Sequence, residues 1–215
     1  MLSSTSDIEA DHPFDVDTAV EPTDDGAFTA TLSDRWNGLL GGPLGGYPLA
    51  ISLQALRQTM PFPDPLVLSA FFLRPARTGQ LDVQTEAVRR GRRMATSEAR
   101  LIQDGKECAR VVATFTDLAQ ASGRTVVLNA PPQLAPPDQA IDPLAGRSPG
   151  GVTIADRIEF RMPRLPGWLT GEPTGTPSAE VWARLKGGRE PDLFTLALMV
   201  DSSRSPCSNL ASRHL

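Results

Sequence analysis

The stretch GGPLGGYPLA, residues 41–50, places four glycines and two prolines directly before the apolar segment ISLQALRQTM. That segment predicts a helix, and the first turn of a helix has N–H groups without partners inside it. Such donors, backed by the helix dipole, can bind a phosphate or a carbonyl oxygen on which negative charge develops. Because Pro48 has no N–H, the candidate ligand-binding donors are those of Gly45, Gly46 and Tyr47, with Gly46 as the expected catalytic amide. The alternative is a tight strand-to-helix turn that needs glycine for positive φ.

A second candidate binding group is the arginine cluster of Arg89, Arg90, Arg92 and Arg93. The planar fork of arginine binds phosphate well, so Arg92 and Arg93 are candidate substrate-binding residues. A solvated turn explains the same cluster without any ligand.

Histidine is scarce in this chain. Only His12 and His214 occur, both near the chain ends. The sequence therefore argues against catalytic triads and metal clusters that are built on a central histidine. Cys108 and Cys207 are too few and too far apart for a metal knuckle or a disulfide framework. We therefore expect no metal and no cofactor, and any catalysis would use a carboxylate, backbone amides and water.

The composition narrows the class of protein. The chain has 215 residues, of which 40% are hydrophobic, and a formal net charge of −4 without a long basic stripe. This composition predicts a packed globular protein and argues against nucleic acid as a partner. The N-terminus has no apolar signal region, and no apolar run approaches the ~18 residues of a membrane span. We expect a cytoplasmic protein.

The hydrophobic pattern predicts an α+β fold. Phe28, Ala30 and Leu32 alternate as in a half-buried strand, and the helix after the glycines is apolar nearly all round, as buried helices are. Three further strands are predicted near residues 65–76, 81–87 and 94–103, and a fourth returns from a turn at Asp104–Gly105. A strand, a buried helix and then strands without helices between them predict an antiparallel sheet wrapped around one central helix.

The rest of the chain predicts a second, similar unit. We expect a lead-in over residues 1–25, a first domain over 26–118 and a Pro- and Ala-rich linker over 119–151. Residues 152–201 then begin to repeat the plan, with strands near 158–162 and 179–185 and an apolar helix that Asp192 caps.

These phrases resemble the double hot-dog acyl-CoA thioesterases of the thioesterase II type, over roughly residues 13 to 201. The resemblance rests on four phrases in the right order: Trp36 with GGPLGGY, then DPLVLSAFFLRPA, then VRRGRRMATSEARLIQDGKECARVVATF, then PDLFTLALMVD. It implies a tandem hot-dog fold, hydrolysis of acyl-CoA without a metal, and paired hot-dog units that share a continuous sheet. The aromatic residues Trp36, Tyr47, Phe71 and Phe72 could then line an acyl tunnel, although core packing explains them equally well.

In that family an aspartate in the second helix works with a threonine and a glutamine to position the hydrolytic water. Asp201 matches the aspartate, and its alternative reading is an ordinary exposed acid near a helix end. The threonine and glutamine have no counterparts in the 14 residues that follow, of which five are serine. The sequence therefore predicts that residues 202–215 form an aberrant tail and that the second hot-dog is incomplete. A frameshift near residue 202 would explain it, and the alternative is a naturally shortened protein that a partner completes.

We therefore expect an acyl-CoA thioesterase-like protein in which Asp201 activates water while helix amides hold the oxyanion. The competing hypothesis is a non-catalytic acyl-CoA-binding protein or an inactive remnant. A hydratase of the same fold ranks third, because its catalytic histidine is missing. Exposed sheet edges predict a homo-oligomer.

Overall fold

The computed structural model describes residues 11–23, 26–38, 41–145, 150–172, 175 and 178–202. Its helices are α1 (Pro13–Thr18), α2 (Gly46–Thr59), α3 (Gly167–Thr170) and α4 (Leu193–Met199). Its strands are β1 (Glu21–Pro22), β2 (Phe28–Leu32), β3 (Asp64–Phe72), β4 (Gly79–Arg90), β5 (Met94–Gln103), β6 (Lys106–Thr116), β7 (Ile158–Arg161) and β8 (Trp182–Leu185). The predicted aberrant tail lies outside the described residues, apart from Ser202.

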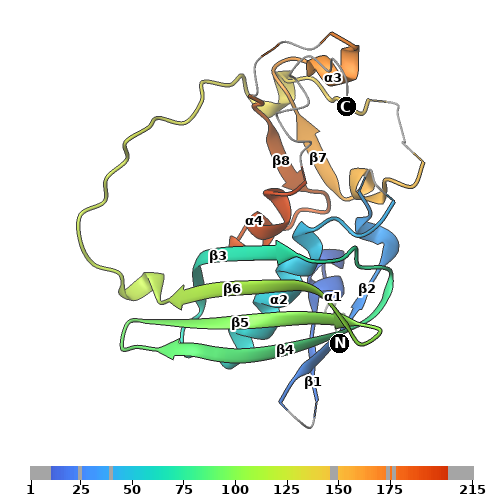
Figure 1. Cartoon of the computed structure of the whole chain (residues 1–215). Coiled ribbons are helices and arrows are strands. Elements are labelled where there is room, and N and C mark those ends of the chain that lie inside the picture. The colour runs from blue at the N-terminus through green and yellow to red at the C-terminus, as the bar shows by residue number, and fades with distance from the viewer. Residues whose placement is uncertain are drawn as a thin grey trace, which may run out of the picture.

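Six antiparallel strands form one sheet in the order β1-β2-β4-β5-β6-β3, and this sheet wraps α2 (Figure 1). The predicted β5–β6 hairpin is confirmed, because Asp104 and Gly105 both have positive φ, at 51° and 71°, between the paired residues Gln103 and Lys106. A turn with two positive φ values matches the right-handed twist of the strands on either side. The predicted α+β arrangement of a sheet around one helix is therefore confirmed.

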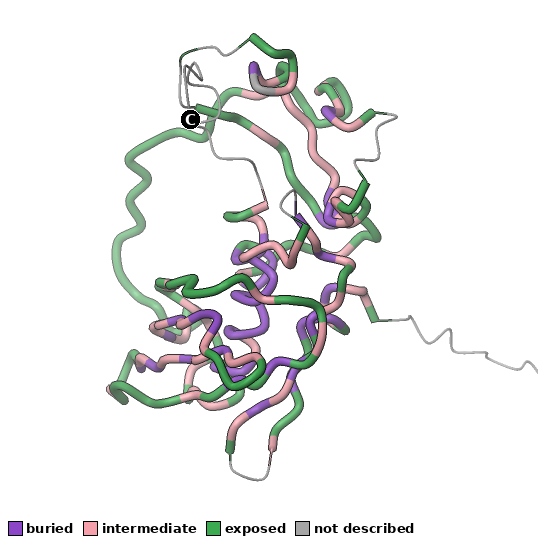
Figure 2. The backbone as a smooth tube through the Cα atoms, turned by 45° about the vertical axis from the view of Figure 1, so that its right-hand side comes forward, coloured by how far each residue is buried: buried purple, intermediate pink, exposed green. Residues whose placement is uncertain are grey.

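The helix α2 forms the centre of the core. Its first eight residues are all buried, as the nearly uniform apolar pattern predicts. Buried positions gather around this helix and on the inner face of the sheet, whereas the segment after β6 is exposed along most of its length (Figure 2). The sheet and the helices α1 and α4 together enclose α2.

The second unit is smaller. The strands β7 and β8 pair as an antiparallel ribbon, and β8 begins at Trp182, later than the predicted strand over 179–185. Residues of this unit belong to the same hydrophobic core cluster as those of the first, namely Ile154, Ile158, Leu185, Phe194, Ala197 and Leu198. The predicted cap of α4 is confirmed, since the Asp192 side chain accepts a hydrogen bond from the Thr195 N–H.

The two units meet where α4 crosses the start of α2. A Cβ atom added at Gly46 would lie 2.5 Å from the carbonyl oxygen of Leu198 and 2.9 Å from that of Ala197. No side chain fits at such a distance, so the backbone of α4 touches α2 only because residue 46 is glycine. One reason for the glycines before α2 is therefore helix–helix contact.

A buried polar cluster holds α1 against the first turn of α2. The Asp17 carboxylate, in α1, accepts a hydrogen bond from Trp36 Nε1 at 2.7 Å and pairs with Arg35. The Trp36 ring packs between Phe14 and Tyr47, with ring centroids 5.7 and 5.9 Å away. Because all of these aromatic rings are buried, α1 is held firmly against β2 and α2.

We predict that Gly46→Ala destabilises the protein by about 3 kcal/mol, because the added methyl group forces α4 away from α2. The matched control is Gly42→Ala in the same loop, where the nearest neighbouring atom would lie 3.6 Å away. Chemical denaturation of both variants measures the difference. Equal stability of the two variants would contradict the close contact.

We also predict that Trp36→Phe costs about 2–4 kcal/mol of unfolding free energy, because the Asp17 carboxylate loses a donor inside the core. Trp182→Phe is the control, since the Trp182 indole also donates a hydrogen bond, to Ala135 O, but is 42% exposed. Its cost should stay below about 1 kcal/mol. Urea denaturation that gives the same loss for both tryptophans would show that the buried cluster is not special.

Candidate active site

The Asp201 carboxylate lies at the N-terminus of α2. Its Oδ2 atom accepts a hydrogen bond from the Gly46 N–H at 3.0 Å, although 155 residues separate the two in the chain. A carboxylate just after the C-terminal end of its own helix is disfavoured by that helix's dipole, but the positive end of α2 compensates here. The structure thus brings together Gly46 and Asp201, two of the predicted site residues.

The N–H groups of the first turn of α2 have different roles. The Tyr47 N–H donates to Leu44 O at 2.9 Å, and the Gly46 N–H is used by Asp201. The Gly45 N–H donates to no acceptor within the described part of the chain. Of the three predicted donors, Gly45 is therefore the one left for a ligand.

A cavity of about 420 Å³ opens beside these groups, between the start of α2 and one end of the sheet. Gly45 and Asp201 form part of its wall. Its other lining residues are mostly apolar: Pro43, Pro48, Phe72, Leu73, Arg74, Pro75, Ala76, Leu81, Leu101, Cys108 and Ala109. Such a space, apolar with few polar groups at one side, is typical of sites for small ligands.

The side chain of Tyr47, whose N–H is one of the predicted donors, lies in the core and not among the residues that line the cavity. Its side chain is fully buried, and its hydroxyl donates to Asp17 O at 2.9 Å and accepts from the Ser33 N–H. Burial raises the pKa of this hydroxyl to about 12. Tyr47 is a core residue that joins α2 to α1, and the same holds for Trp36, whereas Phe72 lines the cavity.

The predicted phosphate ligands Arg92 and Arg93 also lie elsewhere within this chain. They are exposed in the turn that joins β4 to β5, and the cavity residues Leu81 and Leu101 lie at the opposite end of those two strands. The sequence did not reveal which end of the hairpin would meet the glycines. The cavity is instead lined by Arg74, whose guanidinium donates to Glu107 O at 2.7 Å.

No group of three or more His, Cys, Asp and Glu side chains is placed to hold a metal ion in the described part of the chain. Within the same residues, no helix is long and apolar enough to cross a membrane.

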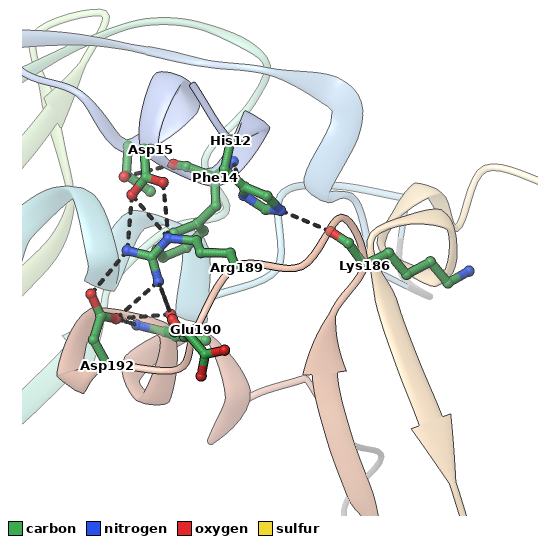
Figure 3. A network of polar contacts seen from close by, with 9 residues as sticks. His12, Phe14, Asp15, Lys186, Arg189, Glu190 and Asp192 are labelled. Carbon is green, nitrogen blue, oxygen red and sulfur yellow. Dashed lines mark hydrogen bonds and ion pairs between the residues drawn. The ribbon is translucent and has the colours of Figure 1, made fainter. Parts of the chain in front are cut away.

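A partly buried arginine that the sequence did not single out, Arg189, lies at the other end of α4. The Arg189 Nη2 atom donates to Asp15 of α1 at 2.8 Å and to Asp192, the cap of α4, at 2.9 Å. Its guanidinium also lies over the Phe14 ring, 4.9 Å from the centroid. Figure 3 shows the guanidinium between the two carboxylates, which come from segments more than 170 residues apart. This arginine therefore joins α1 to the start of α4.

The charges of this network support one another. Burial acts against the charged forms, but the hydrogen bonds outweigh it, so the pKa of Arg189 is raised and that of Asp192 is lowered. A second link lies beside it: His12 Nδ1 accepts from the Phe14 N–H, which leaves Nε2 to donate to Lys186 O at 2.8 Å. The N-terminal segment is thus fastened to the second unit at two points.

Comparison with known families is informative for both units. Residues 32–116 match the family model for the acyl-CoA thioesterase N-terminal domain, and residues 131–214 match the model for the acyl-CoA thioesterase C-terminal domain. The second match begins inside the predicted linker and continues through most of the predicted aberrant tail. No curated protein matches the chain.

Several solved structures have the same fold. A hot-dog protein of unknown function from Alicyclobacillus acidocaldarius is 21% identical, with a TM-score of 0.79 over 92% of this chain and 72% of that one. A putative thioesterase II from Thermobifida fusca is 23% identical, with a TM-score of 0.79 over 93% and 75%. An acyl-CoA thioesterase II from Mycobacterium marinum is 20% identical, with a TM-score of 0.64 over 87% and 68%. At these identities the likeness shows the hot-dog fold, while the matches to both domain models show that the chain belongs to the acyl-CoA thioesterase family.

Proposed function

We propose that this protein hydrolyses an acyl-CoA thioester to a free acid and coenzyme A. The observation that carries the proposal is the meeting of the Asp201 carboxylate with the start of α2 at the wall of the apolar cavity. A carboxylate beside a free backbone donor provides the two groups that hydrolysis needs, a base and a partner for the oxyanion.

The proposed reaction uses water as the nucleophile. The water oxygen attacks the thioester carbonyl carbon while the Asp201 carboxylate takes up a water proton. The negative charge that develops on the carbonyl oxygen is stabilised by the Gly45 N–H and the dipole of α2. The carbon–sulfur bond then breaks, the proton passes to the departing thiolate, and the acid and the free thiol leave.

The cavity suggests how the substrate lies. The apolar side chains of Leu81, Leu101 and Ala109 would pack against the acyl group. Arg74, which lines the cavity and is exposed, would meet the phosphates of coenzyme A in this chain, since Arg92 and Arg93 lie at the far end of the β4–β5 hairpin. A cytoplasmic location and a role in lipid metabolism are the corresponding proposals for where the reaction takes place.

The alternative function is binding without turnover. It is favoured by one feature of the same geometry: the Gly46 N–H has no partner inside α2, so a carboxylate that accepts from it stabilises the helix without any catalytic role. In that case Asp201 would stabilise α2 and take no proton.

We predict that Asp201→Asn abolishes acyl-CoA hydrolysis but leaves stability within about 1 kcal/mol. The amide oxygen of asparagine still accepts from the Gly46 N–H, but it cannot take up a proton. The loss of kcat should be about 10²- to 10⁴-fold, measured as release of free thiol from a panel of acyl-CoA substrates.

Asp201→Ala is the matched control, because it removes both the proton acceptor and the cap, and it should also lower stability by about 1 kcal/mol. Full turnover by Asp201→Asn would refute the catalytic role. Wild-type protein that binds acyl-CoA but releases no thiol would establish the binding function instead.

We also propose that the protein forms a homo-oligomer through β3. Among the described residues, β3 is an edge strand that pairs only with β6. Its exposed side chains are apolar, with Val67 at 56% and Phe71 at 59%, and the strand has no charged residue after Asp64. An exposed apolar edge of this kind favours pairing with another strand. Two copies can pair antiparallel about a twofold axis, which satisfies both edges at once.

Accordingly, we predict that the double substitution Val67→Lys and Phe71→Lys converts the oligomer to a monomer, because like charges would face each other across the twofold axis. Val88→Lys, at an exposed apolar position of β4 away from this edge, should leave the oligomer unchanged. Light scattering after size exclusion gives the masses. A monomeric wild type would overturn the proposal.

A further inference from the structure

The Asp201 carboxylate is placed by a helix that is held at both of its ends. At its C-terminal end, the backbone of α4 contacts Gly46, where an added Cβ would lie 2.5 Å from Leu198 O. This contact is a close van der Waals approach, which by itself does not set the rotation or the register of α4. The directional contacts at this end are those of Asp201 itself.

The directional contacts at the start of α4 come from Arg189. Its Nη1 and Nη2 atoms donate to the two oxygens of Asp192, at 3.2 and 2.9 Å, and Nη1 also donates to the buried Thr195 hydroxyl. Asp192 in turn accepts from the Thr195 N–H at 2.7 Å. The first turn of α4 is thereby fixed to one guanidinium, which is itself only 14% exposed.

That guanidinium is anchored to the first unit through α1. It pairs with Asp15 and lies over Phe14, and two residues further along α1 the Asp17 carbonyl accepts from the Tyr47 hydroxyl. The contacts therefore form a closed ring, which leaves α2 at Tyr47, passes through α1, Arg189 and α4, and returns to α2 at Gly46.

We propose that Arg189 is a positioning residue for the Asp201 carboxylate. It fixes one end of α4, and the carboxylate lies just past the other end, about 10 Å along the helix. The kinetic part of this inference rests on the proposed thioesterase function, because a shift of about 1 Å in a catalytic group can cost about 100-fold in rate.

The first test does not depend on activity. The Gly46 N–H reports the placement of Asp201, because it donates to that carboxylate. When glycine carries ¹⁵N and ¹³C′ labels, a carbonyl-filtered amide spectrum shows only glycines that follow another glycine, and Gly46 is one of these. We expect amide exchange at Gly46 to become about tenfold faster in Arg189→Met, with Arg189→Lys intermediate because it keeps the charge without the fork.

Glu107→Gln is the matched control. Glu107 binds two arginines, Arg100 and Arg110, on the outer face of the sheet, so this variant breaks a similar network that has no link to α4. Its Gly46 exchange should stay within twofold of the wild type. Asp15→Asn, which keeps both Arg189 and the cap of α4, should give the same direction of change as Arg189→Met.

The second test is kinetic. Arg189 is not among the residues that line the cavity, so Arg189→Met should lower kcat about 10- to 100-fold with KM within twofold. If Arg189→Met folds and its Gly46 amide exchanges at the wild-type rate, the proposal is wrong. If Arg189→Met does not fold, the Gly46 exchange rate of Asp15→Asn decides by the same criterion. A wild type without turnover refutes the thioesterase function, but the exchange test of positioning stands.

Discussion

The close approach of the α4 backbone to Gly46 determines both how the two units pack together and where the candidate site forms. It joins the second unit to the central helix of the first, and it brings Asp201 within 3.0 Å of the Gly46 N–H. The same crossing forms one wall of the cavity, since Gly45 and Asp201 both line it. A side chain at position 46 would push α4 away from α2, and the Asp201 carboxylate would move with it. The fold and the candidate site therefore depend on the same steric constraint.

Charged groups at the two ends of α4 add to this steric contact. The dipole of α4 works against a carboxylate after its C-terminal end, and the N-terminus of α2 supplies the opposite sign. At the other end of α4, Asp192 is a helix cap and an ion-pair partner at once, because Arg189 places a partly buried positive charge between it and Asp15. Charged side chains at both ends of the short helix α4 thus make its contacts to the first unit, Asp192 through Arg189 and Asp201 through the Gly46 N–H.

Local patterns were sufficient to predict the framework, because the alternation in β2, the apolar α2 and the Asp104–Gly105 turn are properties of neighbouring residues. Gly45, Gly46 and Asp201 were found through a motif and a resemblance. The hydrogen bond from the Tyr47 hydroxyl to Asp17 O joins segments 30 residues apart, so no pattern around the glycines shows that this side chain joins α2 to α1. The positions of Arg92 and Arg93 depend on which end of a hairpin meets α2, and the Asp15–Arg189 pair spans 174 residues. No local pattern encodes such contacts.

In the proposed function, the two units form one acyl-CoA site where α4 meets the start of α2. The most direct measurement is a crystal structure with a non-hydrolysable acyl-CoA analogue in which a methylene group separates the carbonyl from the sulfur. We expect the carbonyl oxygen within hydrogen-bond distance of the Gly45 N–H, the carbonyl carbon facing Asp201, and the acyl chain against Leu81 and Leu101. An analogue bound with its carbonyl away from Asp201, or outside this cavity, would contradict the account.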